Sequence, residues 1–189
     1  ATDGAVRLGV LAVGTGSDFG RMLESGGSLE ASARALGRAR EELVDVGSIR
    51  FVGESGDDEE RYFLNIASCG VSGIVDRIVN RSSKRLGGTL TFFLAALTAL
   101  RRYRPARVRL TVDGRIEGEL MLNTIAVCNG RYAGGGMMFA PDARLADGQL
   151  DVVAIEHAPL ASTVALSPRI YRGTHVRSPL VRCFRGRVV

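Results

Sequence analysis

The sequence predicts an α+β protein whose two parts differ in character. An apolar run at residues 8–13 breaks at glycines and continues as a helical segment, which is typical of a strand-to-helix junction in an α/β domain. From Val44 onward, short strand-like runs separated by turn residues predict a mainly antiparallel β region with helices. The clearest of these turns is Asp113-Gly114, which lies between two strand-like runs at 107–112 and 115–122.

The first part opens with residues 8–13, whose apolar character predicts a buried strand of a parallel sheet. Two glycines interrupt this run, and a helix is expected to follow over about residues 17–24. Ser28 is a suitable N-cap for a second helix over about residues 29–40. These elements would form the α/β part of the chain.

The pattern in the middle of the chain predicts a β-hairpin, because two strand-like runs flank an acidic loop. The runs are residues 44–52 and 62–67, and the loop is residues 53–61. The elements expected after it are, in order, a turn at 69–73, a short helix at 74–80, a basic linker at 81–88 and a helix at 90–102.

The remainder is mostly strand and loop. Asp113-Gly114 supplies the positive φ angles of a type I′ turn, so the two runs beside it are expected to pair directly. The later elements are expected to be a strand at 123–128, a glycine-rich loop at 129–141, a strand at 150–155, a helix or turn near 160–166 and a last strand near 182–189.

The junction at residues 13–23 is the most informative local feature. A glycine turn between a strand and a helix gathers free backbone N–H groups at the positive end of a helix dipole, where a phosphate can bind. The spacing fits neither a P-loop, which needs Lys-Ser/Thr after its last glycine, nor the dinucleotide fingerprint, because Phe19 stands where that motif has glycine. An ordinary turn capped by Ser17, with Asp18 complementing the dipole, is an equal alternative.

Composition narrows the class of partner. The net charge of +5 favours an anionic partner, but the basic residues are spread along the chain without interleaved aromatics, so nucleic acid is not expected. Three widely spaced cysteines, without any Cys/His ligand spacing, predict reduced thiols and neither a zinc site nor a disulfide framework. The longest apolar run, Leu90 to Leu100, is too short to span a bilayer.

Four blocks of sequence resemble the diacylglycerol kinase catalytic family, particularly its bacterial soluble lipid kinases. They occur in the family's order and cover nearly the whole chain. The blocks are GTGSDFGR at 14–21, RYFLNIASCG at 61–70, Asn129-Gly130 with GGG at 134–136 and PDARLADGQLD at 141–151, and IYRGTH at 170–175. Ser17 departs from the family pattern, which has Asn at this position.

The resemblance implies a domain organisation and an architecture. Residues 1–45 would be the C-terminal part of an α/β ATP-binding domain, and residues 46–189 a β-sandwich lipid-kinase domain. The family's GGDGT loop would lie upstream of Ala1, and its Asp-Gly-Glu segment, which supplies the general base, beyond Val189. The catalytic base is therefore not expected among these residues, and residues 1–189 could be inactive on their own.

The resemblance also assigns two sites. Residues expected at the nucleotide site are Gly14, Thr15, Gly16, Ser17 and Asp18. Thr15 and the backbone of 14–17 would face the ATP phosphates, and Asp18 would act either through the catalytic Mg²⁺ or through loop structure. A structural Mg²⁺ or Ca²⁺ would be held by the backbone of Arg144, the carboxylate of Asp147 and the backbone of Gln149, since hard cations prefer oxygen ligands. A plain β-turn with Asp at a favoured position is the alternative for this segment.

The function implied is that of an ATP- and Mg²⁺-dependent lipid kinase, a phosphotransferase of phospholipid metabolism that acts on a hydroxyl of a diacylglycerol-like lipid. Its partners would be ATP and a lipid substrate at a membrane surface, with a homodimer possible. It would be cytoplasmic and peripherally associated with the inner membrane surface. Two alternatives stay open: a non-catalytic lipid- or nucleotide-binding homologue, and an NAD kinase-like enzyme.

Overall fold

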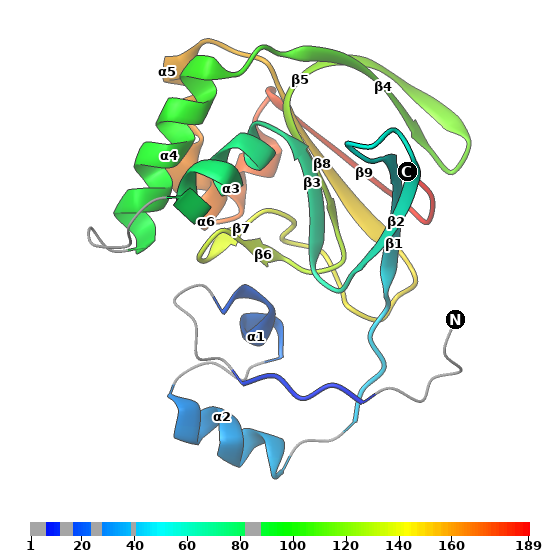
Figure 1. The fold of residues 1–189 in the computed structure, drawn as a ribbon, viewed down its shortest axis with the longest axis vertical. Helices are drawn as coiled ribbons and strands as arrows, with labels where there is room; N and C mark the ends of the chain where they lie inside the picture. Colours follow the sequence, from blue (N-terminus) through cyan, green and yellow to red (C-terminus); the bar gives the residue numbers. More distant parts are fainter. Residues whose placement is uncertain (1–6, 12–16, 24–27, 39–40, 82–87) are drawn as a thin grey trace.

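A computed structural model describes residues 7–11, 17–23, 28–38, 41–81 and 88–189 of the chain (Figure 1). A five-stranded antiparallel sheet forms the centre of the described part. Two further two-stranded pairs lie outside this sheet. The predicted α+β character with mostly antiparallel pairing is therefore confirmed.

The central strand of the main sheet is β5 (Arg115–Cys128), which contacts three others. β4 (Ala106–Val112) pairs with its first part, β3 (Ile66–Gly70) with its last part, and β8 (Leu150–Glu156) with residues from Leu122 onward. β9 (Val181–Gly186) pairs with β8 and completes the order β3-β5-β8-β9.

Both faces of β8 are buried. Successive residues of a strand point to opposite sides of the sheet, and β8 has buried residues on each side. Val152 and Ala154 belong to an apolar cluster with residues of the β4–β5 hairpin, whose strands supply Leu110 and Leu122. Val153 and Ile155 belong to a second cluster, which the glycine-rich loop and α5–α6 cover; its other buried members are Ala126, Cys128, Ala140, Ala143, Leu166 and Val181. The sheet therefore carries the core of the described chain.

The β4–β5 turn has the predicted type I′ conformation, with φ of 47° at Asp113 and 78° at Gly114. The Asp113 carboxylate also accepts hydrogen bonds from the backbone N–H groups of Arg187 (2.8 Å) and Val188 (2.9 Å). These contacts attach the hairpin tip to the segment that follows β9. The N–H bonds from Val188 and then Arg187 lower the pKa of the Asp113 carboxyl.

Helices α3 to α6 gather at the end of the sheet opposite the β4–β5 turn (Figure 1). α3 (Val71–Arg81) and α4 (Gly88–Arg102) pack together around Val75, Ala95 and Ala99. The shorter helices α5 (Leu160–Ala165), α6 (Ser167–Tyr171) and η2 (Thr174–Arg177) connect β8 to β9. Among the described residues, no helix is both long and apolar enough to cross a membrane.

The strand predicted at 8–13 is not found in the described residues: 7–11 form no strand, and 12–13 lie outside the described part. A parallel strand needs a neighbour for its backbone groups, and Leu8 and Leu11 are instead exposed. The two predicted helices are present but shorter, as α1 (Asp18–Met22) and α2 (Leu29–Leu36). The Ser28 hydroxyl accepts the Ala31 N–H at 3.2 Å, as expected of an N-cap.

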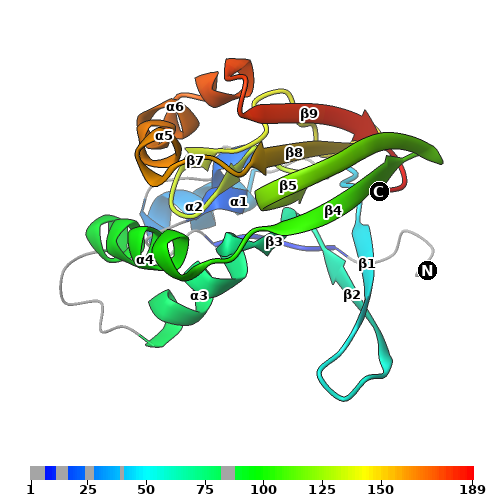
Figure 2. The same cartoon turned by 90° about the horizontal axis from the view of Figure 1, so that it is seen from above.

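The hairpin predicted from 44–52 and 62–67 is only partly correct. Its strands are β1 (Gly47–Val52) and β2 (Asp58–Phe63), so part of the predicted acidic loop is strand. The run at 62–67 divides near Asn65, and its second half enters the main sheet as β3. Figure 2 shows the β1–β2 hairpin projecting away from the sheet.

Candidate functional site

Three of the four sequence blocks are joined by polar side chains, although more than 100 residues separate the first and third along the chain. Asp18, Asn65 and Asn129 make these contacts, and Asp45, which lies outside the blocks, adds bonds to the third block. We call this set of four residues the polar junction. Figure 1 shows α1 beside β6 (Tyr132–Ala133) and β7 (Met137–Met138), which lie in the glycine-rich loop.

Asp18 joins the first block to the glycine-rich loop. Its carboxylate accepts the backbone N–H of Gly135 at 2.8 Å and that of Gly136 at 2.7 Å. Gly134, Gly135 and Gly136 all have positive φ, a conformation that lets successive N–H groups converge on one anion. The glycine loop is therefore an anion cradle whose partner in this structure is the Asp18 carboxylate.

A second contact fixes the other end of α1. The Met22 sulfur accepts the backbone N–H of Arg131 at 3.4 Å, and the Arg131 guanidinium donates to the Ala143 carbonyl at 2.9 Å. A Cβ at Gly130 would collide with the side-chain oxygen of Asn65, so a larger residue there would force the Asn65 side chain to move. The backbone directly after β5 is thus packed between Met22 of α1 and the side chain of Asn65.

Asn65 and Asn129 bind the start of β3 to the end of β5. The Asn65 carbonyl accepts the N–H groups of Asn129 (2.8 Å) and Gly130 (3.0 Å). The Asn129 side chain is fully buried, and its amide donates to the carbonyls of Asp45 (2.8 Å) and Leu64 (2.9 Å). Buried amides of this kind fix a backbone position, because each lost bond would leave a carbonyl unsatisfied.

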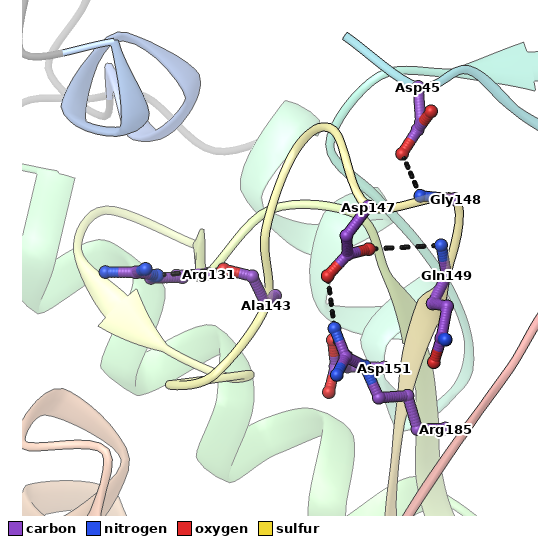
Figure 3. Close-up of polar contacts among 8 residues, drawn as sticks. All are labelled: Asp45, Arg131, Ala143, Asp147, Gly148, Gln149, Asp151 and Arg185. Carbon is purple, nitrogen blue, oxygen red and sulfur yellow. Dashed lines mark hydrogen bonds and ion pairs between the residues drawn. The ribbon is translucent and has the colours of Figure 1, made fainter.

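Asp45 extends these contacts to the turn at 144–149 (Figure 3). Its carboxylate accepts the Gly148 N–H at 2.6 Å, and its own N–H donates to the Leu145 carbonyl at 2.6 Å. Within the turn, the Asp147 carboxylate accepts the Gln149 N–H at 3.1 Å. Asp45 therefore binds the turn at Leu145 and Gly148, and Asp147 binds it at Gln149.

Arg185 of β9 supplies the positive charge near this turn. Its guanidinium donates to Asp147, and its Nε lies 3.7 Å from a carboxylate oxygen of Asp151 (Figure 3). Burial raises the pKa of Asp151, Arg185 opposes that rise, and the charges of Asp147 and Asp142 add to it. Three carboxylates, those of Asp142, Asp147 and Asp151, thus lie near Arg185.

The donor set at the turn matches the chemistry of a hard divalent cation. Asp147 offers a carboxylate, and a tight turn can present backbone carbonyls such as those of Arg144 and Gln149. Among the described residues, no group of three or more His, Cys, Asp and Glu side chains could enclose a metal ion. Any cation at this turn would therefore depend on backbone oxygens as well as Asp147.

The predicted nucleotide residues divide into two groups. Gly14, Thr15 and Gly16 lie outside the described residues. Ser17 is left-handed, with φ of 44°, and its side chain does not cap α1. Asp18 is the first residue of α1, and both its carboxylate oxygens accept bonds from the glycine loop.

Sequence reasoning missed the role of Asp45 and gave Asn65 and Asn129 no role beyond membership of a block. Hydrophobic periodicity does not detect them, because their importance comes from backbone groups far away in the sequence. Asn129 carried one signal, since a polar residue directly after an apolar strand has to satisfy its amide when the strand is buried.

The geometry and the sequence together define the class of protein. Residues 65–189 match the model of the YegS C-terminal NAD kinase beta sandwich-like domain, and the chain belongs to this family. This confirms the expected lipid-kinase resemblance and the β-sandwich character of the second part.

Several relatives with curated names are diacylglycerol kinases. One from Bacillus subtilis (strain 168) is 31% identical over 180 residues, which are 92% of this chain and 54% of the relative. One from Mycobacterium tuberculosis (strain H37Rv) is 30% identical over 189 residues, which are 97% of this chain and 58% of the relative. The chain thus spans a little over half the length of these relatives.

Solved structures agree on the fold. A protein from Bacillus anthracis str. Sterne, described as a candidate diacylglycerol kinase, superposes with a TM-score of 0.65 at 21% identity. The match covers 92% of this chain and 53% of that one. At this identity the likeness establishes the shared fold.

Proposed function

We propose that the protein is an ATP-dependent lipid kinase that transfers the γ-phosphoryl group to a hydroxyl of a diacylglycerol-like lipid. The observation that carries the proposal is the pair of bonds from Gly135 and Gly136 to Asp18. They attach the GTGSDFGR block, next to the expected nucleotide site, to the loop of the β-sandwich domain. The names of the curated relatives support the same activity.

Phosphoryl transfer depends on positioned phosphates and on neutralised charge, with little covalent work left to the protein. We propose that the backbone of 14–17 and the Thr15 hydroxyl contact the phosphates of ATP, which carries Mg²⁺ as its counter-ion. Asp18 would keep the glycine loop in register with that segment. The general base is not assigned to any residue of this chain.

We also propose that the Asp147 turn is a structural cation site. The Asp147 carboxylate and the backbone carbonyls of Arg144 and Gln149 would hold Mg²⁺ or Ca²⁺, which would neutralise the acidic side of the turn. The site would be structural, since the bond from the Gly148 N–H to the Asp45 carboxylate makes the turn part of the contacts of the polar junction.

Work at a membrane surface follows from the proposed substrate, because diacylglycerol-like lipids are membrane components. We propose peripheral association with the inner surface. The positive net charge of the chain would favour an anionic leaflet. Homodimer formation stays a prediction.

The test is transfer of ³²P from [γ-³²P]ATP by the full-length protein to vesicles containing diacylglycerol, phosphatidylglycerol or sphingosine. Label is expected in one lipid. Asp18→Asn should reduce kcat/KM by about tenfold to a hundredfold, because Asn replaces one of the two acceptor oxygens by an NH2 donor and removes the negative charge that both N–H groups meet. Glu54→Gln, in the tip of the β1–β2 hairpin, is the control and should change nothing. Absence of label from every lipid would favour a non-catalytic lipid- or nucleotide-binding homologue.

An NAD kinase-like enzyme is the second candidate, because the matching family model is described as NAD kinase-like. The same assay with NAD as acceptor separates the two. Phosphorylation of NAD, and of no lipid, would replace the lipid-kinase proposal.

A further inference from the structure

The carboxylate proposed to hold a cation is already bonded within the protein. One oxygen of Asp147 accepts the Gln149 N–H, and the other accepts a bond from the Arg185 guanidinium (Figure 3). Arg185 comes from β9, so this contact is made between distant segments and is not local to the turn. A cation that binds Asp147 has to displace this guanidinium or share the carboxylate with it.

The arginine is held in place by a second carboxylate. In the register of β8 and β9, Asp151 lies directly opposite Arg185, and its oxygen is 3.7 Å from the Arg185 Nε. The side chains of Asp147 and Asp151 are 22% and 16% exposed, so water screens these pairs less than it screens surface pairs. One guanidinium thus faces two poorly solvated carboxylates.

Contacts from Asp45 also hold the turn in its shape. The Asp45 carboxylate holds the Gly148 N–H, and the Asp45 N–H holds the Leu145 carbonyl. The shape of the turn is therefore set by bonds on both sides of Asp147.

We propose that Arg185 is a built-in counter-ion of the Asp147 turn and competes there with divalent cations. The guanidinium neutralises Asp147 and Asp151 when no cation is bound, and cation binding requires it to leave Asp147. The inference rests on the cation site proposed at Asp147. It does not depend on phosphoryl transfer, so it can fail while the kinase proposal stands.

The variant that isolates this role is Arg185→Gln, which removes the charge and keeps a polar side chain. Its matched control is Arg182→Gln, because Arg182 lies on the same strand and pairs with a different carboxylate, that of Glu156. Asp147→Asn in the Arg185→Gln background tests whether any new cation binds at Asp147.

The experiment is isothermal titration of Ca²⁺ and of Mg²⁺ into the nucleotide-free full-length protein, with thermal unfolding in EDTA and in each cation. Arg185→Gln is expected to bind Ca²⁺ about tenfold more tightly than the wild type, since two partly screened ion pairs no longer oppose the ion. Its Tm should rise on adding Ca²⁺ by more than that of the wild type. The second substitution, Asp147→Asn, should abolish both gains.

Equal cation affinity in the wild type and in Arg185→Gln would overturn the proposal, as would tighter binding that survives Asp147→Asn. If Arg185→Gln does not fold, Arg185→Lys keeps the charge and should retain the weak affinity of the wild type. A lysine variant with tenfold tighter binding would also overturn the proposal.

Discussion

The main sheet and the polar junction are held by different forces. In the sheet, Leu122 and Val152 are almost completely buried among apolar neighbours, and antiparallel ladders connect β4, β5, β8 and β9. In the polar junction, Asp18 and Asn129 bind backbone groups of segments remote in sequence. Apolar burial supplies most of the free energy of folding, whereas directed hydrogen bonds determine which segments meet. The sheet thus supplies most of the folding stability, and the polar junction determines where the loops and α1 lie relative to the sheet.

The largest expected effect is in the sheet. Leu122→Ala should lower the free energy of unfolding by about 3 kcal/mol, because it leaves a cavity between β5 and β8. Leu43→Ala is the control, since Leu43 is 83% exposed and should have little effect. Urea unfolding of the full-length protein measures both. A loss below about 1 kcal/mol for Leu122→Ala would mean that this cluster is not the source of stability.

A smaller loss is expected in the polar junction. Asn129→Ala should cost about 2 kcal/mol, since it leaves the carbonyls of Asp45 and Leu64 without their donor. Hydrogen exchange should accelerate at Gly148 more than in the interior of β8, because the junction loosens while the sheet persists. Asn80→Ala on the exposed side of α3 is the control. Equal acceleration in both regions would remove the distinction between them.

A pH effect should distinguish a buried histidine from an exposed one. Burial lowers the pKa of His175, and nearby backbone groups of Phe139 and Arg169 oppose this only in part. The unfolded chain then binds a proton more readily than the native state, so stability should fall as the pH decreases below about 6.5. Thermal unfolding between pH 7.5 and 5.5 should show a smaller decrease for His175→Gln than for the wild type. His157→Gln, at an exposed site, should retain the full decrease.

The smallest effect is expected at the β4–β5 turn. The lowered pKa of Asp113 means that its contribution is present above the ordinary carboxyl pKa and is lost as the pH falls through the native one. Asp113→Asn tolerates the left-handed turn and should flatten the dependence of Tm on pH between about 5 and 3. Asp57→Asn, at the tip of the β1–β2 hairpin, should leave this dependence as in the wild type. An unchanged profile for Asp113→Asn would exclude the carboxylate as an anchor for the end of β9.

The sequence predicted the elements whose causes are local. The Asp113-Gly114 turn, the Ser28 cap and the helix predicted at 90–102, which the structure has at 88–102, follow from turn chemistry, capping and periodicity. The strand at 8–13 and the undivided strand at 62–67 were wrong in the described residues, because pairing depends on partners elsewhere in the chain. The domain boundary at 45/46 stays a prediction, although Asp45 contributes to the junction.

In the candidate site, too, the sequence predicted the features with local causes and missed those that depend on distant segments. Resemblance brought together the blocks that contain Asp18, Asn65, Asn129 and Asp147, and these blocks do contact one another. The detailed roles did not follow, because periodicity carries no information on which backbone N–H a carboxylate will meet. Arg185 illustrates this limit: it is one of many arginines in the sequence, and only the pairing of β8 and β9 places it beside Asp147.

The attachment of Asp113 to the segment after β9 has a mechanical consequence. The Asp113 carboxylate accepts two N–H groups of that segment, and the Asp113 N–H donates to the Val188 carbonyl. A pulling force applied at Val189 would therefore reach the β4–β5 tip before it reached the β8–β9 ladder. These three bonds would act as a clasp that has to open before β9 can be peeled from the sheet.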